Sequence, residues 1–225
     1  MNVRLLILVR ERTFADALST RLEAEPDVDV VAALHTTLPA PRLFARGPAD
    51  VVLIDADFPG DAPFHLVEEV SRRPEAPFVI LLSASSDPMR IVRAIRAGAN
   101  GWVRKEESLD YLLAVIRGAV RGETWLPPSE IGEVLRLLMR GATPEQDDGD
   151  LLAGLTVRER EVLACLADGA GRRDVAAYLH VSPNTVRTHV QNLLGKLGVH
   201  STLEAVALTR AQLFEQLSLL HTGAR

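Results

Sequence analysis

The sequence of 225 residues has little of several features that define large classes of protein. It contains a single cysteine, which excludes an intrachain disulfide framework and is typical of a reducing compartment. Cys165 lies among Val162, Leu163 and Leu166, so we expect it to be a core residue. The six histidines are scattered without metal-ligand spacing, and no nucleophile–base pair or cofactor-binding loop is evident. We therefore expect neither a metal centre nor an enzyme.

The chain also lacks a run of about eighteen apolar residues, which a membrane-spanning helix requires. Its first residues, MNVRLLILVRERTF, are not typical of a signal peptide, because the apolar run is short and no small-residue cleavage site follows. We expect a cytoplasmic protein that has no membrane partner.

The charge of the chain is unevenly distributed. The net charge is −5, but residues 151–225 carry eight Lys or Arg against six Asp or Glu, whereas the first 150 residues carry 17 against 24. This asymmetry predicts a mildly basic module joined to an acidic one. Such a small excess of positive charge supports nucleic-acid binding only weakly and indicates few phosphate contacts for each protomer.

The first 125 residues alternate short apolar runs with amphipathic ones. The short runs are nearly all apolar, as expected for strands that are buried on both faces of a parallel sheet. We predict an α/β fold, a doubly wound five-stranded parallel sheet of the flavodoxin-like type, with its site at the carboxyl ends of the strands. The expected strands are 3–9, 28–34, 50–56, 78–83 and 101–104, and the expected helices are 14–22, 64–71, 88–98 and 108–121.

Three polar side chains fall at the predicted strand ends: Asp55, Ser83 and Lys105. A carboxylate, a hydroxyl and an ammonium group at one edge of a sheet suit an acyl phosphate, as nucleophile, hydrogen-bond donor and counter-charge. The segments DVVLIDADFPG and GANGWVRK resemble those of the receiver domain of bacterial response regulators. The resemblance implies that Asp55 is the phospho-acceptor, Ser83 the switch hydroxyl, Trp102 the switch aromatic residue and Lys105 the closing lysine.

One departure from this family concerns the end of the first strand. Receiver domains carry two adjacent acidic residues there, which hold Mg²⁺, and the resemblance places Val9 and Arg10 at these positions. Magnesium requires hard oxygen ligands, and neither side chain provides one. We therefore expect Mg²⁺ binding and phosphotransfer to Asp55 to be weak or absent. Asp57 and Asp61, in the loop after the third strand, would hold a residual ion only weakly and in a poor position.

Several interpretations of Arg10 stay open. Its guanidinium group pairs with Asp55 and partly replaces the metal, since a guanidinium can hold a carboxylate bidentately, or it points to solvent and the pocket has no substitute. A third arrangement turns Glu11 inward after a slip of one residue. If phosphate is not the signal, the sequence does not choose among a small-molecule effector, a protein partner and control by abundance.

Residues 126–150 change in character. Pro127 and Pro128 end the preceding helix, and EIGEVLRLLMR predicts a short amphipathic helix that is capped by Ser129. The acidic segment GATPEQDDGD predicts a flexible linker. We therefore place a linker at 126–150, between a receiver-like domain at 1–125 and a C-terminal domain at 151–215, with a tail at 216–225.

Residues 172–197 have the pattern of two helices joined by a tight turn. In the second helix, Val186, Val190, Leu193 and Leu197 recur at helical spacing, and polar residues occupy the opposite side. Ser182 is a good N-cap for this helix. This pattern is typical of a helix-turn-helix, in which the second helix offers its polar face to the major groove. The alternative is an ordinary amphipathic surface helix.

The flanking segments favour the helix-turn-helix. Thr156 and Glu159 form a predicted capping box before it, and Ser201 and Glu204 form another after it. LTVREREVL, DVAAYLHVSPNTVRTHVQNLLGKLGV and EAVALTR resemble, in order and spacing, the C-terminal DNA-binding domain of LuxR/NarL-type regulators. The resemblance implies an all-α domain of four helices.

This resemblance also implies how the domain contacts double-stranded DNA. Arg187, Thr188 and Gln191 face base edges, and they suit guanine, the thymine methyl group and adenine, respectively. Other polar residues are placed for backbone phosphates, although Thr185 and Lys196 also fit a solvated flank: Ser182, Asn184, Thr185 and Lys196.

The last predicted helix, 202–214, helps to pair two DNA-binding domains in this family. We expect a homodimer on an inverted-repeat site through Leu203, Val206 and Leu213, unless this stripe only closes the four-helix core. Two functions of different classes result. One is a sequence-specific transcriptional regulator controlled independently of aspartate phosphorylation, and the other is an interaction protein whose receiver recruits or sequesters another regulator as a heterodimer. A conventional regulator that is switched at Asp55 is a further alternative.

Overall fold

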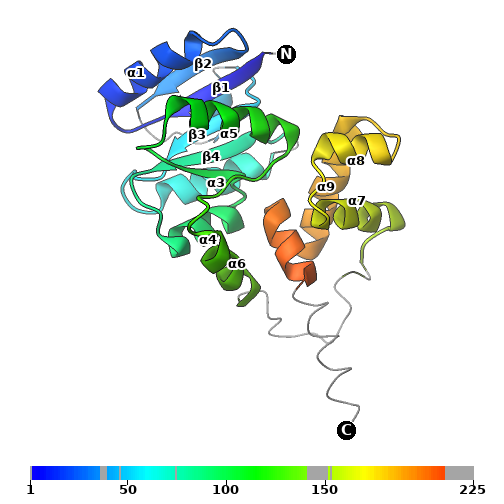
Figure 1. Cartoon of the computed structure of the whole chain (residues 1–225). Coiled ribbons are helices and arrows are strands. Elements are labelled where there is room, and N and C mark those ends of the chain that lie inside the picture. Colours follow the sequence, from blue (N-terminus) through cyan, green and yellow to red (C-terminus); the bar gives the residue numbers. More distant parts are fainter. Residues whose placement is uncertain are drawn as a thin grey trace. The chain divides into compact units, whose positions relative to one another are not determined.

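The computed structural model describes residues 2–35, 40–45, 47–73, 75–140, 152 and 154–210 (Figure 1). The chain divides into two compact units, with the division between Glu130 and Ile131. The predicted linker segment 141–150, Leu213 and the tail at 216–225 lie outside the described residues. None of the helices in the described ranges combines the length and the apolar character that crossing a bilayer requires.

The N-terminal unit is built on a parallel sheet of five strands in the order β2-β1-β3-β4-β5. This confirms the predicted doubly wound fold. The strand bounds agree with the expected ones to within one residue: β1 (Val3–Leu8), β2 (Val28–Leu34), β3 (Val51–Asp55), β4 (Phe78–Ser83) and β5 (Gly101–Arg104). Because all five strands run the same way, their carboxyl ends meet at one edge of the sheet.

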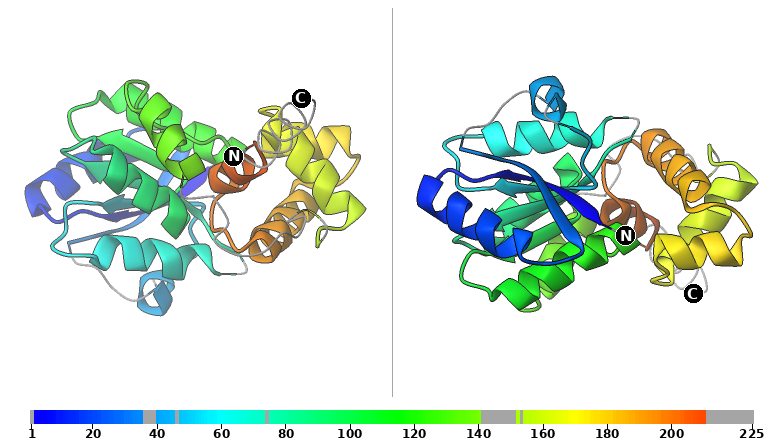
Figure 2. Two further views of the ribbon diagram at one scale, coloured as in Figure 1. Left: turned by 90° about the horizontal axis from the view of Figure 1, so that it is seen from below. Right: turned by 90° about the horizontal axis from the view of Figure 1, so that it is seen from above.

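Helices cover both faces of this sheet. The helices α1 (Arg12–Glu23) and α5 (Leu109–Arg121) lie on one face, and α2 (Ala40–Phe44), α3 (Ala62–Ser71) and α4 (Pro88–Ala97) lie on the other (Figures 1 and 2). The sequence pattern does not predict α2, because five residues are too few to show a helical period.

The central strands are buried on both faces, which explains their almost wholly apolar sequences. In β1, Leu5 and Ile7 belong to a core that is shared with α1 and α5, while Leu6 and Leu8 point the other way and are equally buried. Burial of both faces fixes the register of the strands and thereby the positions of the residues at their ends.

Local signals set the ends of the two helices that follow β4 and β5. The carboxylate of Asp87 accepts a hydrogen bond from the backbone N–H of Met89 (2.9 Å), and α4 ends at Gly98, which has a left-handed φ of 108°. The hydroxyl of Ser108 accepts a hydrogen bond from the backbone N–H of Tyr111 (3.1 Å) at the start of α5. These caps fix the loops that border the carboxyl edge of the sheet.

The C-terminal unit is helical throughout its described elements. It contains α6 (Ile131–Arg140), α7 (Val157–Ala167), α8 (Arg172–Tyr178), α9 (Pro183–Leu197) and a segment that is helical from 202 to 210, the last described residue. The helix predicted for EIGEVLRLLMR is therefore α6, and it buries Val134 and Leu138. The helix-turn-helix prediction corresponds to α8 and α9.

The core of this unit is formed by the apolar stripe that the sequence predicts. Val186, Val190, Leu193 and Leu197 of α9 are buried, together with residues of α7 and α8 that include Val175. Cys165 is partly buried against the same core, in keeping with its predicted packing role. The opposite side of α9 is left for polar side chains.

Candidate functional site

The carboxylate of Asp55 lies at the end of β3 and is fully buried. Its Oδ1 is 2.8 Å from the ammonium nitrogen of Lys105 and accepts a hydrogen bond from the backbone N–H of Asp57 (2.9 Å). Its Oδ2 accepts a hydrogen bond from the backbone N–H of Arg10 (3.1 Å). The closing lysine therefore pairs with Asp55 itself, and both carboxylate oxygens have donors.

The side chain of Arg10 does not take part in this pairing, so the predicted guanidinium–Asp55 pair is wrong. The Nε and Nη2 atoms of Arg10 donate to Oε1 of Glu11 at 3.0 and 2.7 Å, and the side chain is about half exposed. The neighbouring carboxylate is the nearer anion, and it holds the guanidinium outside the pocket. Glu11 also faces Lys105, whose ammonium nitrogen is 3.4 Å from Glu11 Oε2.

The carboxylate of Asp57 faces the hydrogen-bond donors at this edge of the sheet. Its Oδ1 accepts a hydrogen bond from the hydroxyl of Ser83 (2.8 Å), and its Oδ2 accepts one from the backbone N–H of Ala84 (2.8 Å). The ammonium nitrogen of Lys105 and the Nη1 atom of Arg90 each lie 3.3 Å from this carboxylate. The carboxylate of Asp57 is thus surrounded by donors, and the expectation that it would hold a residual metal ion only weakly stays a prediction.

Arginines of α4 tie the loop after β3 to that helix. Arg90 donates from Nη2 to the backbone carbonyl of Ala56 (2.6 Å), in addition to its contact with Asp57. Arg93, one turn further along α4, pairs with Asp61 (2.5 Å) at the exposed end of the loop. The inner pair is partly buried and the outer pair is largely exposed, so the inner pair does more to fix the loop.

Asp57 and Lys105 belong to one cluster of charged side chains, and both stay charged at neutral pH. Burial disfavours the charged form of Asp57, but the N–H of Ala84, the hydroxyl of Ser83 and the charge of Lys105 outweigh burial and lower its pKa. Burial likewise opposes the charge of Lys105, and its contacts with Asp55 and Asp57 outweigh burial and raise its pKa. The cluster is therefore an ionic network and not a set of neutral hydrogen bonds.

The loop after β4 connects this cluster to the predicted switch aromatic residue. The backbone N–H of Ser85 donates to the Ser83 hydroxyl (3.1 Å), and the indole N–H of Trp102 donates to the carbonyl of Ser85 (3.0 Å). Only 1% of Trp102 is exposed, and the guanidinium carbon of Arg90 lies 5.8 Å from the centroid of its ring. The structure thus brings Asp55, Ser83, Trp102 and Lys105 together, as the sequence predicts.

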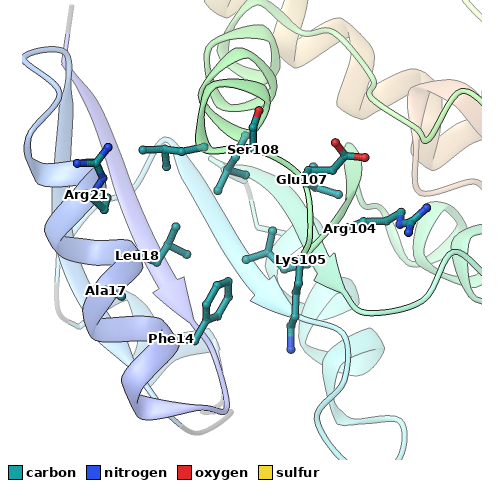
Figure 3. A pocket seen from close by; sticks show the side chains of 12 residues that line it. Phe14, Ala17, Leu18, Arg21, Arg104, Lys105, Glu107 and Ser108 are labelled. Carbon is teal, nitrogen blue, oxygen red and sulfur yellow. The ribbon is translucent and has the colours of Figure 1, made fainter.

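The stem of Lys105 lines an apolar pocket of about 220 Å³ between α1 and α5. Phe14, Leu18 and Leu112 are among the other residues that line it. In Figure 3 the side chain of Lys105 extends away from Glu107 and Ser108, so that its ammonium group lies beyond the apolar wall. Apolar packing of the stem leaves the charged end free to reach the carboxylates.

The second candidate site is the polar side of α9. The hydroxyl of Ser182 accepts a hydrogen bond from the backbone N–H of Thr185 (3.1 Å), which confirms the predicted N-cap, and it lies 2.8 Å from the hydroxyl of Thr185. Thr188 is exposed and donates its hydroxyl to the carbonyl of Asn184 (3.1 Å), one turn earlier. The methyl group of Thr188 and the acceptor lone pairs of its hydroxyl are therefore the groups left for a partner.

The two residues predicted to read bases by bidentate hydrogen bonds, Arg187 and Gln191, are half-buried on the same side of α9. They lie four residues apart and therefore share one helical face with Asn184 and Thr188. Lys196 lies five residues beyond Gln191, near the end of the helix.

The ammonium group of Lys196 contacts the buried carboxylate of Glu159 in α7, at 2.7 Å. The same carboxylate oxygen accepts a hydrogen bond from the backbone N–H of Thr156 (2.8 Å) and completes the predicted capping box. The predicted box at Ser201 differs, because the carboxylate of Glu204 accepts from the backbone N–H of His200, while the Ser201 hydroxyl accepts from that of Glu204.

Comparison with known proteins identifies both halves of the chain. Residues 6–117 match the family model of the response regulator receiver domain, and residues 153–209 match that of bacterial regulatory proteins of the luxR family. The chain is 32% identical to the fimbriae Z protein of Salmonella typhimurium over 159 residues, which span 71% of this chain and 73% of that protein. The chain is a LuxR-type response regulator.

Further similarities agree with this assignment. The response regulator is 30% identical to the nitrate/nitrite response regulator protein NarP of Escherichia coli, over 83% of this chain and 85% of that protein. A solved structure of two RcsB dimers bound to two parallel DNAs has a TM-score of 0.53 at 19% identity, over 94% of this chain and 99% of that chain, and this likeness concerns the fold. The family is one of DNA-binding transcriptional regulators.

The family also implies a Mg²⁺ ion beside the phospho-acceptor, and the residues of this response regulator do not fit it. Val9 is fully buried and apolar, and Arg10 brings a positive charge to the end of β1. Asp55 and Asp57 already face cationic or N–H donors. Within the part of the chain that the structure describes, no group of three or more His, Cys, Asp or Glu side chains is arranged to hold a metal ion.

Two members of the pocket were not assigned to it from the sequence: Asp57 as an acceptor for the donors, and Arg90 as a cation beside it. Asp57 lies two residues beyond Asp55, and this spacing was the signal that could have placed both carboxylates in one pocket. Arg90 lies near the start of an amphipathic helix, where the sequence does not distinguish a solvated arginine from one that turns toward the sheet.

Proposed function

We propose that this response regulator binds specific double-stranded DNA as a homodimer and that its activity does not depend on phosphorylation of Asp55. The observation that carries the second part is the end of β1, where buried Val9 and outward-turned Arg10 replace the metal-binding acids of the family. Without oxygen ligands there, the charge that develops on a transferring phosphoryl group has no divalent counter-ion.

The polar face of α9 supports the first part. Arg187, Thr188 and Gln191 are the side chains that would enter the major groove, and the hydroxyls of Ser182 and Thr185 lie at the positive N-terminus of the helix, where a phosphate would be bound. The weak positive charge of residues 151–225 favours two copies of this segment on one site, since a dimer doubles the phosphate contacts. A relative of similar fold, RcsB, is described as dimers bound to DNA.

Phosphorylation is tested by intact-mass analysis of the full chain after incubation with Mg²⁺ and acetyl phosphate. We expect no phosphoryl adduct. A stoichiometric adduct that disappears in Asp55→Asn would contradict the proposal and make the protein a conventional phospho-switched regulator. A control receiver that carries the acidic pair must be labelled under the same conditions.

DNA binding is tested by titrating duplexes at several salt concentrations. A salt-dependent preference for one duplex over random DNA is the expected result. Equal, weak binding to all duplexes, combined with formation of a complex with a second regulator, would instead support an interaction protein that acts by recruitment or sequestration.

A further inference from the structure

Two of the donors around Asp57 are groups to which the resemblance to receiver domains gives a role toward the phosphoryl group. The resemblance assigns the switch hydroxyl to Ser83 and the counter-charge to Lys105, and in this structure both contact the carboxylate of Asp57. The backbone N–H of Ala84 and the guanidinium of Arg90 complete the set. One anion therefore already sits among these four donors.

We propose that the carboxylate of Asp57 is a built-in substitute for the phosphoryl group. Without any covalent modification, it keeps the Ser83 hydroxyl and the loop after β4 hydrogen-bonded to the pocket. This inference rests on the proposed independence from phosphorylation and adds a second cause to the missing metal ligands at the end of β1. The carboxylate and the phosphoryl group share the relevant chemistry, because each is an anion with several acceptor oxygens.

The count of hydrogen atoms in the pocket agrees with an occupied site. The Ser83 hydroxyl has one proton, which it gives to Asp57, and the three ammonium protons of Lys105 face three carboxylates, those of Asp55, Asp57 and Glu11. The charges of Lys105 and Arg90 are matched by those of Asp55 and Asp57. A phosphoryl group added to Asp55 would meet a second anion where its donors should be.

A chain of hydrogen bonds also connects Asp57 to Trp102 through the loop after β4. Asp57 accepts hydrogen bonds from the Ser83 hydroxyl and the N–H of Ala84. The Ser83 hydroxyl accepts one from the N–H of Ser85, and the carbonyl of Ser85 accepts one from the indole of Trp102. The last residue of β4 and the first two residues of the loop after it are thus fixed by one carboxylate. Loss of that carboxylate should release the loop and the hydrogen bond of the buried indole together.

The test replaces Asp57 by Ala in the full chain and follows Trp102 by ¹⁹F NMR after incorporation of 5-fluorotryptophan. The chain has two tryptophans, and Trp125→Phe assigns the two resonances. The matched control is Asp61→Ala, which removes a carboxylate of the same loop that pairs with Arg93 outside the cluster. We expect Asp57→Ala to shift or broaden the Trp102 resonance and Asp61→Ala to leave it in place.

Rescue by added anions makes the test specific to a filled anion position. In Asp57→Ala, the donors of Ser83, Ala84, Arg90 and Lys105 face an open space, so acetate or inorganic phosphate should return the Trp102 resonance toward its wild-type position. The wild-type protein should not respond to the same additions. Chloride at equal ionic strength controls for screening.

Several outcomes would overturn the inference. An unchanged Trp102 resonance in Asp57→Ala, an equal change in Asp61→Ala, or a shift that acetate and phosphate fail to reverse would each show that Asp57 does not serve as the substitute anion. If Asp57→Ala does not fold, Asp57→Asn keeps the shape and removes the charge, and the same shift is required of it, without rescue by anions because the amide still fills the position.

The inference and the proposed function fail in distinguishable ways. A phosphoryl adduct on Asp55 of the wild-type protein would contradict both. Absence of the adduct, together with an unresponsive Trp102 in Asp57→Ala, would leave independence from phosphorylation standing and remove only the role of Asp57.

Discussion

Among single residues, Glu159 links the start of α7 to the end of α9. Its side chain is buried, caps α7 through the N–H of Thr156 and pairs with Lys196 near the end of α9. The hydrogen bond from Lys196 is the main cause of its lowered pKa, and the N–H of Thr156 adds to it. This arrangement gives Lys196 a structural role in addition to its predicted contact with a DNA phosphate.

Replacement of Glu159 by Gln should lower the free energy of unfolding by about 1 kcal/mol near neutral pH, because the cap weakens and Lys196 loses its counter-ion. Since the folded-state pKa of Glu159 is lowered, its contribution is present above the ordinary pKa of about 4.3 and is lost as the pH falls through the lowered value. Thermal melts of both proteins at decreasing pH should therefore converge. A constant difference at all pH values would contradict the ionic contribution.

Replacement of Arg187 by Ala should cost about 1–3 kcal/mol of DNA-binding free energy and relax the preference at one base pair, as expected for a bidentate contact with guanine. Binding titrations against all four base pairs at each position measure this. Lys196→Ala is the comparison, because it should weaken all sequences alike and also lower the melting temperature through Glu159. A uniform loss for Arg187→Ala would place its contact on phosphate.

Replacement of both Val9 and Arg10 by Asp restores the acidic pair of the family, yet we expect no phosphorylation of Asp55 by acetyl phosphate and Mg²⁺. The donors would still be held by Asp57. Addition of Asp57→Ala to this variant should permit the adduct, as read by intact mass. Circular dichroism must show that each variant is folded, because Val9 is buried. Labelling of the double variant alone would indicate that Asp57 moves aside.

The sequence predicts which residues form the pocket better than it predicts where their polar side chains point. Asp55, Ser83 and Trp102 could be assigned because each ends or lies in a buried strand, and Lys105 because it directly follows one, so that the register of the sheet leaves one place for each. Arg10 and Asp57 lie in loops, where competing partners decide the outcome. Arg10 pairs with Glu11, and Asp57 contacts four donors. Residue spacing alone does not predict either choice of partner.

Among the elements, α9 has one glycine inside its last turn and another directly after it, with opposite requirements. Gly198 ends the helix with a left-handed φ of 67°, and Gly195 lies inside the helix. A Cβ atom at either position would meet nothing within 4 Å, so the backbone conformation alone decides the effect of a side chain. The N–H of Gly198 also donates to the carbonyl of Gly195 (3.3 Å) at this helix end.

Substitution of Gly198 by Ala should therefore destabilise the C-terminal unit by about 1 kcal/mol, because left-handed backbone is costly for a residue with a Cβ atom. Substitution of Gly195 by Ala should stabilise it by about 0.5–1 kcal/mol, because alanine restricts the unfolded chain and favours helix. Chemical denaturation of the two variants measures both. Equal signs would contradict the assigned helix end.

Element prediction succeeded where composition and caps agreed. The β strands were readable because both faces are buried, and α7 and α9 because Thr156 and Ser182 cap them as expected. The short helix α2 was missed because its five residues have no periodic signal, and the second capping box was only half right because Glu204 bonds one residue earlier than expected.

For the molecule as a whole, a homodimer requires apolar residues on the surface of the C-terminal unit that are not already buried in its core. In the helical segment 202–210, Ala205 and Leu208 are buried in that core, whereas Leu203 and Val206 are half-buried. Val206 also packs against the core, so Leu203 is the cleaner probe of pairing.

Replacement of Leu203 by Glu should weaken binding to an inverted repeat while leaving the melting temperature of the protein nearly unchanged, because a charge at the paired surface opposes close approach of two units. Binding to a single half-site should be unaffected, which serves as the control. Analytical ultracentrifugation on and off DNA reports the stoichiometry. A loss of stability equal to that of a core substitution would show that Leu203 only closes the unit.

The position of Asp57 two residues from Asp55 has a kinetic consequence for the cell. A carboxylate held beside its donors by the fold of its own chain acts at an effective concentration in at least the millimolar range, and dilution does not reduce it. Free phosphate or acetyl phosphate must compete with a ligand that never diffuses away. The output of such a regulator would then follow its copy number, and its response time would be that of synthesis and degradation instead of phosphotransfer.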